Sequence, residues 1–312
     1  MVTTTTPERY APLDLTVDPA QLGLETITVT SDLGSAVARH RRTVASPRAT
    51  IFLHGAAGSW TTWTPLLQTA ENAGVVLCNP VLIDLPGWGD GTLTERGEDV
   101  AIEAVCSLVK DCAEELGYTE WDIVGHSMGG FIALHMASIW PGSVMSVGII
   151  SATGQSIIDS VEHPLRHFFR LPAFIMLWQA MRLLKTFGSG GTAFVRWLGR
   201  IGVLRGLVTP LFRHTGRIPP RVIAALGSEL RPRAFTVAAS IANGYDLVSH
   251  WSRIQSPVRA IRGDDDVFST ADDLERVDAV VTHCTSTTIS DCGHFAAIER
   301  PGAVLAALGY LD

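Results

Sequence analysis

Apolar residues follow two alternating patterns along this chain. Short apolar runs that end at glycine or at polar residues are typical of buried strands, and longer segments with apolar residues at every third or fourth position are typical of helices. The expected strands are residues 25–30, 36–44, 49–53, 75–83, 121–124, 144–151, 258–262 and 285–289. The expected helices are residues 61–73, 98–116, 131–140, 235–251, 270–277 and 301–311. Such an alternation predicts an α/β fold in which helices cover both faces of a mostly parallel sheet, preceded by a hairpin formed by the first two strands.

This alternation stops between residues 152 and 233. The segment has helical spacing throughout, and it contains 12 Lys and Arg residues against 3 Asp and Glu residues, a net charge of +9. The chain as a whole carries −7, so the remainder carries −16. We interpret the segment as an inserted, all-helical cap, with residues 1–151 and 234–312 forming the core domain.

Composition narrows the class of protein further. A chain of 312 residues, 46% of them hydrophobic, can bury a large core without disulfides or a structural metal. Its negative net charge argues against binding to nucleic acid. Its five cysteines lack the spacing of a metal site, so neither a metal nor another cofactor is expected. The first residues do not resemble a signal peptide, and the longest uncharged apolar run, residues 171–181, is too short to span a bilayer. We therefore expect a cytoplasmic protein without an integral membrane segment; the oligomeric state is not predicted.

A Gly-x-Ser-x-Gly pattern lies between an expected strand and an expected helix. Gly125 and Gly129 flank Ser127 at the spacing of a nucleophile elbow, a tight turn that presents a serine at the start of a helix. Glycine is needed where two backbones pass too closely for a Cβ atom. A serine hydroxyl attacks efficiently only when a base accepts its proton and a carboxylate orients that base. Asp266 and His294 follow Ser127 in the order Ser, Asp, His, each just after an expected strand.

The motifs at the strand ends together resemble those of the α/β-hydrolase fold family. They are HGAAG, DLPGWG, GHSMGG, GDDD and GHF followed by ERP, and the resemblance extends from about residue 48 onward. It implies a catalytic triad of Ser127, Asp266 and His294, with Asp264 and Asp265 as turn residues. It also implies that the backbone N–H groups of Ala56 and Met128 form the oxyanion hole.

Four other polar residues in or near these motifs could take part in catalysis, but we favour a structural role for each. We interpret His126 as a packing residue, His54 as a brace for the oxyanion loop, His135 as a hydrogen-bonded core residue and Asp84 as a residue that fixes its loop.

The function that these features favour is hydrolysis of a small carboxylic ester through an acyl-enzyme. Hydrolysis of a carbon–carbon bond is an alternative, although family members with that activity usually have Asn at position 126 and Trp at position 295. Lactonase and perhydrolase activities use the same triad, and a non-catalytic ligand receptor is a more distant alternative. Dehalogenases and epoxide hydrolases of the family need an aspartate at position 127, which here is Ser127.

The basic cap suggests an anionic substrate. Arg166 and Arg170 are interleaved with large apolar residues, and with Phe295 they are candidates for binding an amphiphilic monoester, such as a monoalkyl ester of an aromatic diacid. Two alternatives are that these arginines only form the solvent-exposed faces of amphipathic helices or that they contact anionic lipid.

Overall fold

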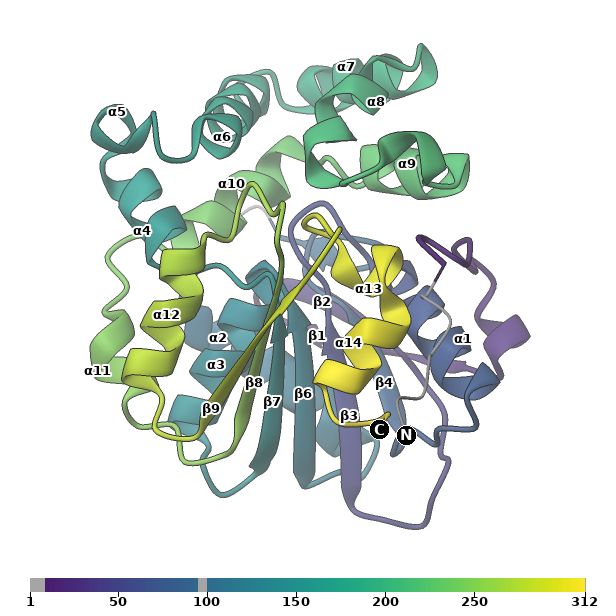
Figure 1. Cartoon of the computed structure of the whole chain (residues 1–312). Coiled ribbons are helices and arrows are strands. Elements are labelled where there is room, and N and C mark those ends of the chain that lie inside the picture. The colour runs from purple at the N-terminus through teal and green to yellow at the C-terminus, as the bar shows by residue number, and fades with distance from the viewer. Residues whose placement is uncertain (1–8, 95–99, 312) are drawn as a thin grey trace, which may run out of the picture.

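A nine-stranded sheet runs through the described residues, 9–94 and 100–311, of the computed structural model (Figure 1). Its main path is β1-β2-β4-β3-β6-β7-β8-β9, with β5 paired to β2. Strands β4 to β9 along this path are parallel, and β2 is antiparallel to both of its neighbours on the path, β1 and β4. The strands are β1 (Glu25–Ser31), β2 (Gly34–His40), β3 (Arg48–Leu53), β4 (Pro80–Asp84), β5 (Thr92–Leu93), β6 (Glu120–His126), β7 (Val144–Ile150), β8 (Val258–Gly263) and β9 (Cys284–Ile289).

Helices cover both faces of this sheet, because successive side chains of a strand point to opposite faces. On β3, Ile51 and Leu53 belong to the cluster beneath one layer of helices, whereas Phe52 belongs to the cluster beneath the other. The first layer contains α2 (Ile102–Glu115), α3 (Met128–Ile139), α11 (Leu247–Trp251) and α12 (Ala271–Val280). The second contains α1 (Thr64–Asn72), α13 (Ala296–Glu299) and α14 (Pro301–Ala307). The predicted α/β-hydrolase fold is confirmed.

Several element bounds differ from those expected. The strand expected at 75–83 begins only at Pro80, because Asn79 adopts a positive φ and its side chain accepts hydrogen bonds from the backbone of the chain at Thr43. The single helix expected at 235–251 is divided into α10 (Pro232–Ile241) and α11, with Gly244 at a positive φ between them. The helix expected from residue 98 begins at Ile102, and residues 98 and 99 lie outside the described residues.

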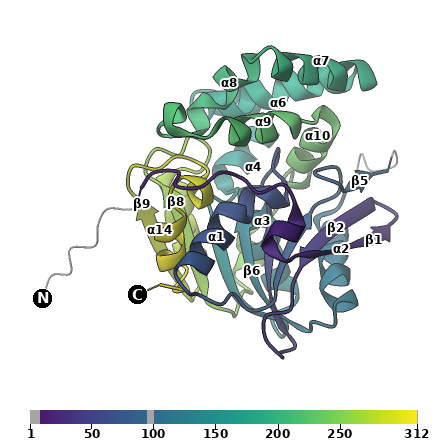
Figure 2. The same ribbon diagram turned by 90° about the vertical axis from the view of Figure 1, so that its right-hand side faces the viewer.

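The segment between β7 and β8 forms a layer of helices over the carboxyl ends of the strands (Figures 1 and 2). We call residues 155–228 the helical insertion; its described residues contain no strand. Its helices are α4 (Gln155–Glu162), α5 (Pro164–His167), α6 (Pro172–Lys185), α7 (Ser189–Arg200), α8 (Val203–Val208) and α9 (Pro220–Ser228), with short 3-10 turns at Thr209–Leu211 and Thr215–Arg217. Helix α10 packs on both layers, since Phe235 joins the cluster of the insertion and Val237 that of the sheet. No helix among the described residues is long and apolar enough to cross a membrane.

Candidate active site

Ser127 occupies a strained turn between β6 and α3. Its φ is 51° and its ψ is −116°, a combination that residues with a side chain rarely adopt. The two flanking glycines permit this turn. A Cβ on Gly125 would collide with the carbonyl oxygen of Gly129, and one on Gly129 with that of Leu53. Ser127 is therefore presented at the N-terminus of α3, the positive end of the helix dipole.

Asp266 and His294 form a buried, hydrogen-bonded pair. The Nδ1 of His294 lies 2.9 Å from Oδ1 of Asp266, which also accepts the backbone N–H groups of Phe268 (2.8 Å) and Ser269 (3.0 Å). Burial raises the pKa of Asp266, but the His294 charge and these hydrogen bonds outweigh it, so the pKa lies below its ordinary value. An ionised Asp266 accepts the Nδ1–H of His294 and leaves Nε2 free to accept a proton.

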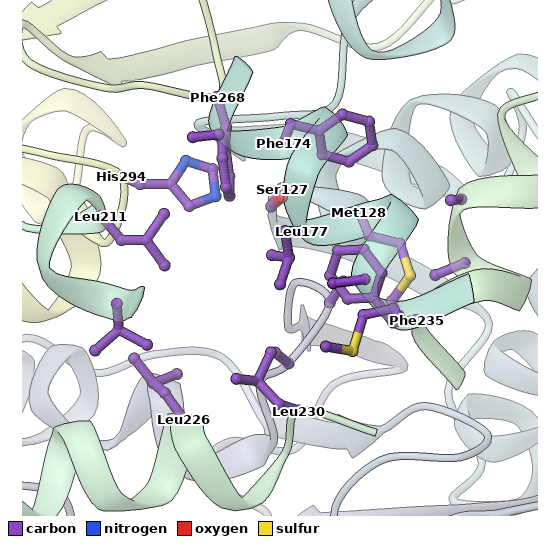
Figure 3. Close-up of a pocket in the computed structure, with 18 of the residues that line it drawn as sticks. Ser127, Met128, Phe174, Leu177, Leu211, Leu226, Leu230, Phe235, Phe268 and His294 are labelled. Carbon is purple, nitrogen blue, oxygen red and sulfur yellow. The ribbon is translucent and has the colours of Figure 1, made fainter. Parts of the chain in front are cut away.

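Ser127 and His294 line one cavity, into which both side chains point (Figure 3). The described residues contain no hydrogen bond between the two side chains. Sites without substrate often show long catalytic contacts that tighten when substrate binds. The structure thus brings the three predicted residues to the carboxyl ends of β6, β8 and β9.

Glu299 anchors the loop that carries His294, a role that the sequence analysis missed. One oxygen, Oε2, accepts hydrogen bonds from the Tyr10 hydroxyl (2.6 Å) and from the N–H groups of Gly293 (2.9 Å) and Arg213 (3.0 Å). The other, Oε1, accepts the N–H of Phe295 (3.1 Å). Burial raises the pKa of Glu299, and the four donors act against that shift. Glu299 directly follows the apolar run at residues 295–298, but this local pattern does not indicate its distant partners.

Asp264 supports the same loop from the other side. Its carboxylate accepts the N–H groups of Asp291 (3.0 Å) and Cys292 (3.1 Å), so it is more than a turn residue. Asp265, which is exposed like Asp264, pairs with Arg213 at 3.1 Å.

The loop after β3 lies against Ser127, and His54 braces it as predicted. The N–H of Leu85 donates to Nε2 of His54 (3.1 Å), so Nδ1 carries the proton and donates to the Gly55 carbonyl (2.7 Å). A Cβ on Gly55 would lie 2.9 Å from that of Ser127. Ala56 and Met128 both line the cavity. Their predicted role as oxyanion donors stays a proposal.

The remaining polar residues of the motifs have structural partners. Asp84 fixes its loop as predicted, because it accepts the N–H groups of Trp60 (2.8 Å) and Asp90 (3.0 Å) and pairs with Arg39. His126 donates from Nε2 to the His294 carbonyl (2.9 Å), and burial lowers its pKa to about 3, so the ring is uncharged. His135 bonds the Tyr245 hydroxyl through Nδ1 (3.0 Å), while its Nε2 has no hydrogen bond among the described residues.

The cavity has a volume of about 570 Å³ and is almost entirely apolar (Figure 3). No Lys, Arg, Asp or Glu is among the described residues that line it. Phe295 lines it as expected, but Arg166 and Arg170 do not. Both arginines are exposed, and Arg170 pairs with Asp272 at 2.6 Å, so neither is part of the wall of this cavity. Within the described residues, no cluster of three His, Cys, Asp or Glu side chains could hold a metal ion.

Comparison with known proteins identifies the family of this chain. Residues 50–308 match the model of the alpha/beta hydrolase family. Epoxide hydrolase 4 of Mus musculus is 27% identical over 133 residues, which are 40% of this chain and 36% of that protein. Protein phosphatase methylesterase 1 of Bos taurus is 27% identical over 151 residues, which are 46% of this chain and 39% of that protein. The chain thus matches less than two fifths of the length of each of these curated relatives.

A solved structure matches over a longer stretch. The naproxen esterase of Bacillus subtilis superposes with a TM-score of 0.65 and 16% identity, over 92% of this chain and 90% of that one. At this identity the likeness concerns the fold alone. Because the family model covers most of the chain, from β3 to the C-terminal end of α14, the chain belongs to the alpha/beta hydrolase family.

Proposed function

We propose that this protein hydrolyses carboxylic esters through an acyl-enzyme on Ser127, with His294 as the general base and Asp266 as the carboxylate that orients it. As Ser127 Oγ attacks the ester carbonyl, its proton passes to Nε2 of His294. The oxyanion that forms accepts hydrogen bonds from the N–H groups of Ala56 and Met128. His294 then protonates the departing alcohol, and the same base activates the water that releases the acid. The observation that carries this proposal is the buried Asp266–His294 pair, in which His294 lines the same cavity as Ser127.

A serine at position 127 favours ester over epoxide hydrolysis, although two relatives by sequence have these different activities in their names. An attack by Ser127 on an epoxide carbon would leave an ether on the enzyme, which water does not hydrolyse under mild conditions. An attack on an ester leaves an acyl-enzyme, whose carbonyl the same oxyanion donors can activate for water. Ser127 can therefore turn over only with an acyl substrate.

The apolar cavity favours a neutral, lipophilic ester or lactone. A monoester with a free carboxylate would have to leave water for a wall without Lys or Arg among its described residues, and burying an unpaired charge costs several kcal/mol. We propose that the helical insertion acts as a cap that shapes this cavity, because α6 and α7 supply many of its lining residues. The neutral diester of an aromatic diacid should thus be a better substrate than its monoester.

The test uses Ser127→Ala. A fluorophosphonate probe should label the parent chain at Ser127 and fail to label the variant. Turnover of p-nitrophenyl butyrate should fall by about 10³-fold or more, because the attacking atom is lost. A variant that keeps a few per cent of kcat, or a parent chain that is labelled but turns over none of a panel of esters and lactones, would contradict the proposed function.

A further inference from the structure

The exposed large apolar side chains of this protein are concentrated on the helical insertion. Among the described residues, the large apolar side chains that are exposed outside the insertion are four valines: Val17, Val44, Val76 and Val248. Of the residues that the structure describes, those of the insertion alone expose Leu, Ile, Phe, Met and Trp side chains. We call the following set the outer face: Leu165, Phe169, Met176, Leu183, Phe187, Phe194, Trp197, Ile201 and Val203.

These side chains form stripes along the helices. On α6 and just beyond it, Met176, Leu183 and Phe187 are spaced by seven and four residues, which places them on one side of the helix. On α7, Phe194 and Trp197 stack with ring centroids 5.8 Å apart. Leu165 and Phe169, near α5, are 94% and 93% exposed. In both views α6, α7 and α8 lie beyond α9 and α10, on the side away from the sheet (Figures 1 and 2).

Most of the helical insertion, from residue 163 to residue 228, has basic but no acidic side chains. Residues 163–228 contain ten Lys and Arg residues and no Asp or Glu. Arg166, Arg196 and Arg200 are exposed and form no ion pair within the described residues. A purely solvated helical surface would mix both signs of charge and place its apolar side chains inward. Here large apolar and cationic side chains share the outside.

The outer face is continuous with the cavity. Met176, Leu183 and Phe194 are exposed to solvent and also line the cavity that contains Ser127. Leu184 and Val195, their neighbours on the same helices, lie deeper in its wall. An apolar molecule can therefore pass from the outer face toward Ser127 along apolar side chains.

We propose that the outer face docks on the surface of an anionic lipid bilayer and takes lipid-dissolved esters from it into the cavity. The apolar side chains enter the boundary between headgroups and acyl chains, and Arg166, Arg196 and Arg200 face the anionic headgroups. A second copy of this chain fits less well, because two such faces would oppose like charges. Docking is independent of the proposed function, whereas delivery of a substrate rests on it.

Binding is tested on the full chain with Ser127→Ala, so that the assay requires no catalysis. The probe is sedimentation with vesicles of phosphatidylcholine, with and without a third of phosphatidylglycerol. We expect binding to the anionic vesicles that weakens as salt rises. Each Lys or Arg at an anionic surface contributes about fivefold to binding, so Arg196→Gln with Arg200→Gln should weaken it about 25-fold. Phe169→Ser with Trp197→Ser should weaken it as well.

Matched controls lie outside the outer face. Val248→Ser and Arg253→Gln change an exposed valine and an exposed arginine elsewhere, and they should leave vesicle binding unchanged. A brominated lipid should quench the fluorescence of the chain, and Trp197→Phe should remove much of this quenching. The proposal is overturned by equal affinity for neutral and anionic vesicles, by no affinity for either, or by a dimer that the outer-face substitutions dissociate.

Delivery is tested separately from docking. In the chain with Ser127 intact, the pair Phe169→Ser and Trp197→Ser, and the pair Arg196→Gln and Arg200→Gln, should each lower the turnover of p-nitrophenyl palmitate dissolved in anionic vesicles. Neither pair should lower the turnover of p-nitrophenyl acetate in buffer. None of Phe169, Arg196, Trp197 and Arg200 lines the cavity. Equal loss on both substrates would refute delivery. Delivery would also be refuted if the substitutions abolished vesicle binding but left the turnover of both esters unchanged. Failure to hydrolyse either ester would count against the proposed function and leave the binding result standing.

Discussion

Replacing Asp266 with asparagine isolates the contribution of its charge. Oδ1 of Asp266 accepts hydrogen bonds from His294 and from the N–H groups of Phe268 and Ser269. In Asp266→Asn the amide oxygen should take this position, because an amide nitrogen there would face two N–H donors of the turn. His294 would then keep its proton on Nδ1, and the variant would lose the negative charge rather than the geometry.

The magnitude follows from the distance between the charges. The imidazolium that forms in the transition state lies next to the carboxylate, with charge centres about 4 Å apart. At an effective dielectric constant of about 20, their attraction is about 4 kcal/mol. Its loss should lower kcat by about a thousandfold. KM should change little, because Asp266 is not among the described residues that line the cavity.

The assay is steady-state hydrolysis of p-nitrophenyl butyrate, with urea denaturation to confirm folding. Asp265→Asn is the control, since Asp265 is exposed and contacts Arg213, and it should stay within about twofold of the parent. Asp264→Asn should lose stability and a smaller part of kcat, because its carboxylate holds the loop at Asp291 and Cys292. An Asp266→Asn enzyme with more than a tenth of parental kcat, or a larger loss in Asp264→Asn, would refute this reasoning.

Three further predictions follow from the surroundings of the site. Glu299→Gln should lower the free energy of unfolding by about 1–3 kcal/mol in urea, because one of four donors then faces an amide N–H₂; unchanged stability would contradict this. Gly55→Ala should lower kcat more than tenfold, since its Cβ would lie 2.9 Å from that of Ser127, whereas Gly142→Ala, in open space, should not; equal kcat values would refute the steric argument. Stability should rise with pH between about 4 and 6.5, by up to about 1.4 kcal/mol per unit for each of His126 and His135. Burial lowers their pKa values to about 3 and about 4, so the unfolded chain binds more protons in that range. In urea denaturation, His135→Gln should remove the contribution of His135 to this pH dependence of the free energy of unfolding. An unchanged pH dependence in the variant would contradict the prediction.

The sequence predicted those parts of the site that depend on short, local signals. The turn at Ser127 needs two glycines at fixed spacing, and these are visible without a structure. The resemblance to the α/β-hydrolase family implied Asp266, which is hydrogen-bonded to His294, among three adjacent aspartates. The strand-and-helix alternation likewise gave the order of the elements, since a buried strand and an amphipathic helix each have a characteristic period.

Features that depend on the meeting of distant segments were not predictable. The partners of Glu299 are Tyr10, Arg213 between α8 and α9 of the helical insertion, and the loop at Gly293, and no local pattern connects them. Arg166 and Arg170 were expected at the cavity because of their charge. The docking of the helices decides which side of each helix faces inward, and it left both outside. The charge count of a helical segment does not contain that information.

The hydrogen bond between Tyr10 and Glu299 has a consequence for the order of folding. It joins residues 289 positions apart, and the loop that it anchors carries His294. Contacts across so long a separation form late, because closing a long loop costs entropy before other contacts repay it. The strands and helices around Ser127 can therefore assemble while the base is still unfixed. A partly folded chain would then have Ser127 in place without a base to activate it. Acyl transfer would begin only after the loop with His294 had been anchored.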